Sequence, residues 1–250
     1  MTQQIIRAKF PGLFEWYPII AIPIAFIASA LVGMALERSV IRWLYGRPLE
    51  TLLATWGISL VLQQAVRSTF GAQNVPVENP NWLSGGVEIM SNLVLPFNRI
   101  AIIAFAFIVL AGVALLIART RFGLFIRGVT QNRRMASCVG VDTARVDMLA
   151  FSFGAGIAGL GGVALSQIGN VGPDLGQSYI VDSFLVVVVG GVGQLAGTVV
   201  AGLGLGVLNK LLEGVAGAVL AKIAVLVFIV IFIQRKPSGL FAMKGRSAEA

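Results

Sequence analysis

The stretch VVVVGGVGQLAG, residues 186–197, decides how this chain folds. Four valines precede the spacing Gly191-x-Gly193-x-x-Ala196. An acid, Glu213, follows twenty residues after Gly193, which completes the outline of a dinucleotide-binding turn. That turn needs an amphipathic helix after the glycines, whereas the residues around this stretch are apolar on every face. We therefore predict that the glycines interrupt an apolar helix and do not hold a pyrophosphate.

The composition indicates that lipid is the solvent for most of the surface. Of 250 residues, 57% are hydrophobic and only 12% are charged, whereas a soluble domain carries roughly 25% charged residues. We therefore predict an all-α fold, a polytopic transmembrane helical bundle that forms a single transmembrane domain over residues 1–250. The sequence has one cysteine, Cys138, and no histidine, which excludes an internal disulfide and most transition-metal sites. We expect no metal ion and no cofactor.

Apolar blocks recur at the length that crosses a bilayer, about 20 residues per helix. We predict spans at about 16–36, 52–70, 100–118, 148–168, 181–208 and 216–233. The block 181–208 is too long for one untilted span, and four glycines interrupt it: Gly190, Gly191, Gly193 and Gly197. Broken helices are tolerated in a membrane where protein or water covers the free backbone. We therefore predict a glycine-broken, re-entrant segment that enters and leaves on the same side.

The basic residues give the orientation of these spans. Lys and Arg cluster in residues 37–50, in the loop 119–146 and after residue 233, and such clusters mark the cytoplasmic side. The loop 71–98 has two acidic residues and no Lys or Arg, so we expect it to face outward. The amino terminus then lies outside, and a re-entrant segment near 181–208 is needed to bring the tail to the cytoplasm.

Polar residues are candidates for a solute pathway. They recur every four positions along one span, with a tryptophan beside them: Thr51, Thr55, Trp56, Ser59 and Gln63. Polar side chains at membrane depth face a helix partner or a wet path, so both hydrogen bonds between helices and a pathway for a small polar solute stay open. Gln167 lies near the outer end of the span 148–168, where it is either an ordinary interfacial residue or a solute contact. Gln194 lies at the predicted helix break. The pathway hypothesis includes both glutamines.

Small residues predict close packing of two helices. In the span 148–168, Ala158, Gly162 and Ser166 recur every four residues, so we expect them to share the packing face. After the glycine break, Gly193, Gly197 and Ala201 have the same spacing, as do Gly202 and Gly206.

Ionisable residues are scarce at membrane depth. Asp147 and Asp182 lie at the ends of apolar blocks, and Lys222 lies about six residues into the last block, from which its ammonium can reach outward. The sequence has no phosphate-binding loop of the form Gly-x-x-x-x-Gly-Lys-Ser/Thr and no converging set of catalytic side chains. We therefore predict that the chain is not an enzyme and that its energy source is another chain.

The loop 119–146 is the strongest candidate for contact with a partner. It is strongly basic, and the apolar residues among its arginines suit a short helix that docks on another protein. The charge alone also suits anionic lipid headgroups. The residues that we single out are Arg121, Phe122, Arg127, Arg133, Arg134, Ala136 and Gly140.

This loop carries a resemblance to a known family. The stretch RTRFGLFIRGVTQNRRMASCVGVDTARVDMLAF, residues 119–151, resembles the coupling region of ABC-importer permeases of the branched-chain amino acid family. In that family a short loop helix, with alanine four residues before glycine, docks on the ATPase subunit, and the resemblance puts Ala136 and Gly140 at those positions. Arg134 stands where the usual version of the motif has an acid.

Residues 44–67 and the tail RKPSGLFAMKGR are similar to the urea-type branch of this family, and residues 190–202 resemble the glycine pattern of the family as a whole. The resemblance implies a permease domain in the bacterial inner membrane that imports urea or a short amide. Its partners would be ABC ATPase subunits, a second permease subunit and a periplasmic solute-binding protein. The family begins with about two further spans, which this chain lacks, so we expect it to start in the family's first outside loop. The alternatives are a branched-chain amino acid permease subunit and a passive channel or secondary carrier.

Overall fold

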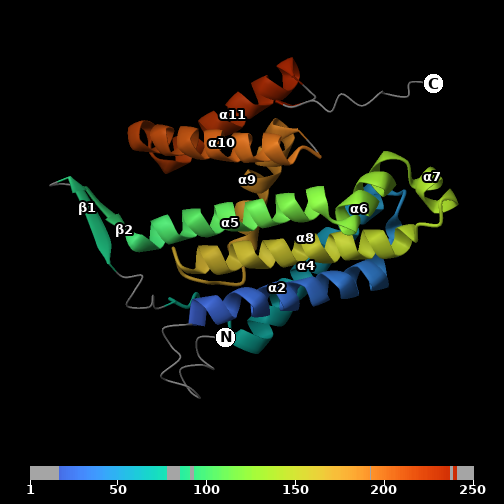
Figure 1. Cartoon of the computed structure of the whole chain (residues 1–250). Helices are drawn as coiled ribbons and strands as arrows, with labels where there is room; N and C mark the ends of the chain where they lie inside the picture. Colours follow the sequence, from blue (N-terminus) through green and yellow to red (C-terminus); the bar gives the residue numbers. More distant parts are fainter. Residues whose placement is uncertain (1–16, 78–84, 91–92, 192, 237–238, 241–250) are drawn as a thin grey trace. The chain divides into compact units, whose positions relative to one another are not determined.

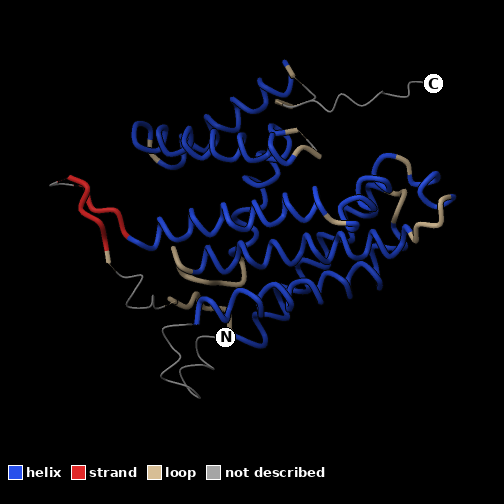
Figure 2. Tube along the Cα trace, in the orientation of Figure 1, coloured by secondary structure: helices blue, strands red, loops and turns tan. Residues whose placement is uncertain are grey.

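The computed structural model describes residues 17–77, 85–90, 93–191, 193–236 and 239–240. These residues are mainly helical (Figure 1), and the named strands are confined to one antiparallel hairpin of β1 (Gly86–Met90) and β2 (Leu93–Pro96) (Figure 2). The helices are α2 (Tyr17–Leu36), the π-helix η2 (Glu37–Ile41), α3 (Arg42–Leu44), α4 (Pro48–Phe70), α5 (Phe97–Arg119), α6 (Arg121–Gln131), α7 (Arg133–Cys138), α8 (Thr143–Ser166), α9 (Leu175–Gly190), α10 (Leu195–Ala216) and α11 (Ala218–Arg235). The predicted all-α fold is confirmed.

Five helical segments among the described residues are long and apolar enough to cross a membrane: Tyr17–Leu44, Phe97–Arg119, Thr143–Ser166, Leu195–Val215 and Ala218–Arg235. Large apolar side chains are exposed along all of them, as expected where lipid is the solvent. The predicted span 52–70 lies in the 23-residue helix α4, which is not among these five. Its evenly spaced polar residues account for its lower hydropathy.

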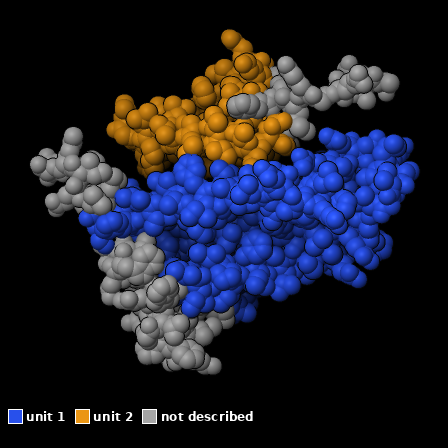
Figure 3. Space-filling view, viewed as in Figure 1, with its two compact units in different colours: residues 1–173 blue, residues 174–250 orange. Residues whose placement is uncertain are grey.

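The chain divides into two compact units, unit 1 (residues 1–173) and unit 2 (residues 174–250) (Figure 3). In unit 1, α2 and α8 pack side by side (Figure 1) because small residues of α8 face α2. A Cβ atom on Gly156 would lie 2.6 Å from the Phe26 ring. The Ser152 hydroxyl donates a 2.8 Å hydrogen bond to the Ala30 carbonyl, which joins the two helices through a buried polar contact.

The expected packing face of α8 was wrong. Ala158 is exposed, and a Cβ atom on Gly162 would meet nothing within 4 Å. The Ser166 hydroxyl bonds to the Val163 carbonyl of its own helix. Gly156 takes the close contact instead, and it lies two residues, or about 200°, around the helix from Ala158. Several small residues are spread around α8, so spacing alone did not select the face.

The two ends of unit 1 separate the basic segments from the acidic loop. At one end, Arg133 lies over the ring of Tyr45, so the segments 37–50 and 119–146 meet there. At the other end, Val75 and Val171 form an isolated antiparallel bridge, which joins the loop 71–98 to the residues after α8. This separation is what the predicted cytoplasmic and outer sides require.

Unit 2 contains the predicted glycine break, and it is confirmed. Helix α9 ends at Gly190, and α10 begins at Leu195. Between them Gly191 has φ 99° and Gly193 has φ 86°, a backbone region that favours glycine. A Cβ atom on Gly190 would lie 2.6 Å from the backbone of Thr198, so α9 and the start of α10 cross at backbone contact.

The two halves of the broken block differ in length. Helix α9 has 16 residues, whereas α10 has 22 and continues past the predicted end at residue 208. A re-entrant segment that enters and leaves on one side within residues 181–208 would need two short halves, but α10 is long enough to cross a membrane by itself. Gly217, with φ 81°, separates α10 from α11.

The core of unit 2 forms where three helices meet. Val189 of α9, Ala201 and Leu205 of α10, and Ile229 of α11 are buried together. Gly197 is also buried, so the predicted packing stripe is confirmed at Gly197 and Ala201, whereas Gly193 and Gly206 are exposed. These contacts fix the α9–α10 crossing against α11.

Candidate functional site

The loop 119–146 folds into α6 and α7 at the basic end of unit 1 (Figure 1). Thr120 ends α5 and caps α6, because its hydroxyl accepts a 3.3 Å hydrogen bond from the Gly123 amide. A Cβ atom on Gly123 would collide with the backbone of Ile117. Glycine is therefore required where the chain turns from α5 into α6.

Helix α6 is amphipathic and presents one face to α8. The rings of Phe122 and Phe153 meet edge to face, with centroids 5.8 Å apart. Val129 is buried on the same side. Phe122 was singled out for partner contact, and in this structure its ring anchors α6 to α8. Leu124 is exposed on the opposite side, and Phe125, almost one turn after Phe122, is also exposed.

The end of α7 explains the spacing of Ala136 and Gly140. The Val141 amide bonds to the Ala136 carbonyl, and the Gly140 amide bonds to the Ser137 carbonyl, at 3.0 Å each. Gly140 has φ 86°. This is the Schellman arrangement that ends a helix at a left-handed glycine. The alanine–glycine spacing therefore fixes where α7 stops.

An open groove of about 620 Å³ lies between α6 and α7. It is mostly apolar, and three of its side chains are well exposed: Leu124 (61%), Met135 (61%) and Val139 (79%). The lining residues are Leu124, Phe125, Arg127, Gly128, Gln131, Asn132, Met135, Ala136, Val139 and Val141. An apolar groove that lies on a basic segment outside the membrane-spanning helices is suited to a protein partner.

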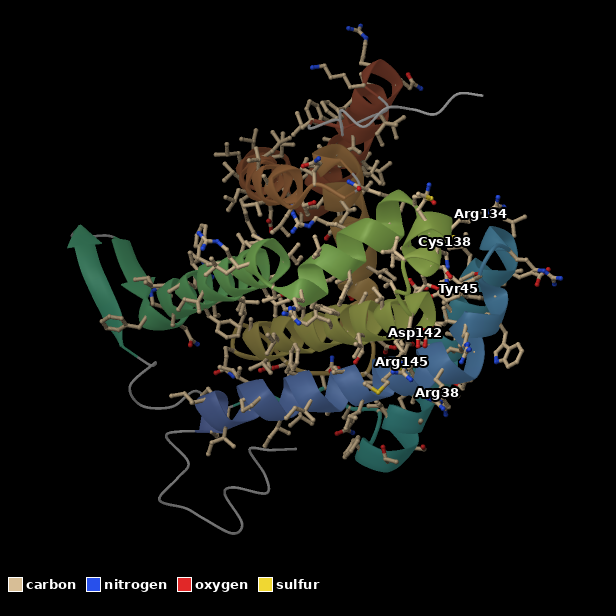
Figure 4. All side chains as sticks on the ribbon, turned by 45° about the vertical axis from the view of Figure 1, so that its right-hand side comes forward. Arg38, Tyr45, Arg134, Cys138, Asp142 and Arg145 are labelled. Carbon is tan, nitrogen blue, oxygen red and sulfur yellow. The ribbon has the colours of Figure 1, made fainter. Side chains whose placement is uncertain are left out.

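The arginines of this loop have different roles. Arg127 caps the end of α5, since its guanidinium donates to the carbonyls of Ile117 and Gly123. Arg133 Nη2 lies 2.6 Å from Asp147 Oδ2, as an ion pair without the alignment of a hydrogen bond. Arg121 and Arg134 are exposed. Figure 4 labels Arg134, Cys138 and Tyr45 at this end of unit 1.

Tyr45 is electrostatically coupled to this cluster. Burial raises the pKa of its phenol above the usual range, and the carboxylates of Asp147 and Glu37 raise the pKa further, while the Arg133 guanidinium partly opposes them. The phenol therefore stays protonated at neutral pH. Its neutral ring faces the guanidinium of Arg133 at 5.2 Å.

The hydroxyl groups of the predicted pathway residues on α4 form hydrogen bonds with the backbone. The hydroxyls of Thr55 and Ser59 bond to carbonyls of α4 itself, and the Thr51 hydroxyl bonds to the carbonyls of Leu44 and Arg47. Trp56 and Gln63 also lie on α4, with the Trp56 side chain exposed. The pathway role of these residues stays a prediction.

Gln167 joins three helices at the outer end of unit 1. Its side-chain oxygen accepts a 3.2 Å hydrogen bond from Tyr17, and its carbonyl accepts a 3.0 Å bond from Asn98. It also lines an apolar cavity of about 140 Å³ between α2, α5 and α8. Gln194 lies in unit 2 and precedes α10 without a side-chain capping bond. The structure therefore gives Gln167 an interhelical role and leaves the solute contact as a prediction.

A pair of opposite charges in unit 2 was missed by sequence reasoning. Asp182 of α9 and Lys222 of α11 form an ion pair with N and O 3.4 Å apart. The Lys222 side chain is 60% exposed, so it both reaches outward and has a partner in α9. The signal available in the sequence was that isolated opposite charges within apolar segments tend to pair.

Comparison with known proteins identifies the family. Residues 8–234 match the model of the family described as branched-chain amino acid transport system / permease component. The chain is 28% identical over 224 residues to the high-affinity branched-chain amino acid transport system permease protein BraD of Pseudomonas aeruginosa, covering 86% of this chain and 73% of BraD.

More distant relatives agree. The chain is 27% identical over 221 residues to the permease protein LivH of Salmonella typhimurium, covering 86% of this chain and 71% of that protein. It is 23% identical over 248 residues to the probable permease protein LivH of Methanocaldococcus jannaschii, covering 91% and 76%. No solved structure shows a significant match.

The matched relatives of this chain are transport permease subunits and not enzymes. The chain is a multi-pass inner-membrane protein. The chain belongs to the branched-chain amino acid transport system permease family.

Proposed function

We propose that this chain is the membrane-spanning subunit of an ATP-driven importer and that a cytoplasmic ATPase docks in the groove between α6 and α7. The groove carries this proposal, because its exposed Met135 and Val139 offer apolar anchors and it lies on a basic segment that we predict to be cytoplasmic. A passive channel or secondary carrier has no use for such a surface.

The partners follow from the proposed mechanism. ABC ATPase subunits would close on binding ATP and push on α7, and a second permease subunit would complete the pathway. A periplasmic solute-binding protein would deliver the solute on the opposite side. Family membership supports ATPase and binding-protein partners in general, and the particular set belongs to the proposal.

The proposed solute is a branched-chain amino acid. The matched relatives are named for transport of branched-chain amino acids, and none of these names supports urea or a short amide. The expectation of urea or a short amide came from the resemblance to the urea-type branch. A zwitterion needs partners for both of its charges, and Asp182 and Lys222 supply opposite charges in unit 2.

Uptake by the complete transporter tests this function. We expect cells that lack other leucine carriers, and that express the chain with its neighbouring subunits, to accumulate labelled leucine and not labelled urea. Uptake should fall to background after ATP depletion or deletion of this chain. Accumulation of urea alone would contradict the proposed solute and leave the proposed importer function standing. Uptake that survives ATP depletion would contradict the importer and favour a passive channel.

A further inference from the structure

We infer that the Arg133–Asp147 ion pair, with the Tyr45 ring against it, transmits movement of α7 to the membrane-spanning helix α8. The inference rests on the proposed function, because an ATPase in the groove supplies the movement. It assigns Arg133 and Asp147 as positioning residues that act through helices and do not contact solute.

The contacts connect three elements. Arg133 begins α7, Asp147 lies in the second turn of α8, and Tyr45 follows α3. The guanidinium of Arg133 lies 2.6 Å from the Asp147 carboxylate and 5.2 Å from the centre of the Tyr45 ring. The Arg133 side chain therefore joins the groove helix α7 to the membrane span α8 and to the end of the span Tyr17–Leu44.

The other ion pairs described in unit 1 cannot do this. Arg47–Glu50 and Arg145–Asp142 each join residues three positions apart, so neither connects two packed helices. Their four side chains are all at least 53% exposed, whereas Arg133 is 48% and Asp147 only 18% exposed. Exposed pairs contribute little because water screens them, while a shielded carboxylate depends on its partner.

Helix α7 lies where a partner in the groove would displace it, so the Arg133–Asp147 pair receives that movement. Helix α7 has only six residues, and it contributes Met135 and Ala136 to the groove. A partner pressing on the groove displaces α7, and Arg133 then pulls or releases Asp147. Because α8 packs along α2 through Gly156 and Ser152, a displacement at Asp147 reaches both helices.

The end of α2 contains a second feature suited to movement. Residues Glu37–Ile41 form a π-helix immediately before α3 and Tyr45, and π-turns within helices are common at functional sites. Glu37 is 2% exposed, and its Oε1 atom has no hydrogen-bond partner among the described residues. A buried, incompletely bonded carboxylate is easily perturbed, so this joint suits a segment that changes conformation.

The test measures coupling between ATP hydrolysis and uptake in the complete transporter, reconstituted in proteoliposomes. We expect Arg133→Ala and Asp147→Asn each to reduce the solute imported per ATP hydrolysed about tenfold, within the usual range of coupling between sites. ATP hydrolysis and ATPase binding should persist. Asp147→Asn keeps the side-chain volume, so it removes the charge without unpacking α8. The exchange Arg133→Asp with Asp147→Arg should restore most of the ratio.

Arg145→Ala is the matched control, since it breaks an exposed pair at the same end of unit 1 and should leave the ratio unchanged. An unchanged ratio in both single variants, or no recovery in the exchange variant, would overturn the inference. Loss of the ATPase from the Arg133→Ala complex would also overturn it, by making Arg133 a docking contact. If the wild-type transporter shows no ATP-dependent uptake, the proposed function fails before any variant is compared.

Discussion

Gly190→Leu is expected to abolish uptake and to destabilise unit 2 by about 3 kcal/mol, the upper end of the usual cost of overpacking. A Cβ atom at this position would lie 2.6 Å from both the Cα and the amide nitrogen of Thr198. Backbone atoms cannot rotate away as a flexible side chain does, so α9 and α10 must separate. Separation would open the core that Val189 forms with Ala201 and Ile229.

Thermal unfolding of the purified protein in detergent, together with uptake in cells, measures this effect. Gly190→Ala should show a smaller loss in the same direction. Gly204→Ala is the control: a Cβ atom there would meet nothing within 4 Å, and alanine favours a helix over glycine by at most about 1 kcal/mol. Wild-type unfolding and uptake in Gly190→Leu would show that α9 and α10 do not cross at backbone contact.

Acidic substitutions in the groove should separate the ATPase from the permease. Val139→Glu combined with Met135→Glu places two carboxylates among apolar lining residues that are 79% and 61% exposed, so the fold has little to lose. We expect the affinity for the ATPase to fall by about 30-fold or more, equivalent to 2 kcal/mol at an interface hot spot. ATP-dependent uptake should disappear with it.

Co-purification of the ATPase with the permease measures this loss. Ser137→Glu adds one carboxylate, against two in the double variant, at an exposed residue of α7 outside the groove lining, and it should cause less than half of the decrease in binding free energy. Equal retention of the ATPase by the wild type and the double variant would show that the groove is not the docking surface.

The sequence predicted those features that depend on local chemistry. Apolar blocks predicted membrane-spanning helices because burial in lipid requires long apolar segments. The break after Gly190 was predictable because clustered glycines disfavour a continuous helix and allow positive φ angles, which Gly191 and Gly193 adopt. The separation of the basic segments from the loop 71–98 followed from charge. The spacing of Ala136 and Gly140 drew attention to α7, and its helix-ending role became clear from the hydrogen bonds.

Features that depend on tertiary contacts were less accessible. Asp182 and Lys222 are forty positions apart, so no local pattern pairs them. The packing face of α8 was misjudged because several small residues surround the helix. Arg133 resembled the other basic residues of its loop, yet its guanidinium is the one near Asp147. The positive charge of Arg133 predicted the side of the membrane on which it lies, and it did not predict Asp147 as its ion-pair partner.

The central claim is that α6 and α7 lie in the cytoplasm and bind an ATPase, and Cys138 allows a direct test. It is the only cysteine in the sequence, and it is exposed on α7 next to the groove residue Val139. A membrane-impermeant maleimide should label it in inside-out vesicles and not in right-side-out vesicles, and bound ATPase should slow the labelling. Labelling in sealed right-side-out vesicles, or a rate that the ATPase does not change, would contradict the account.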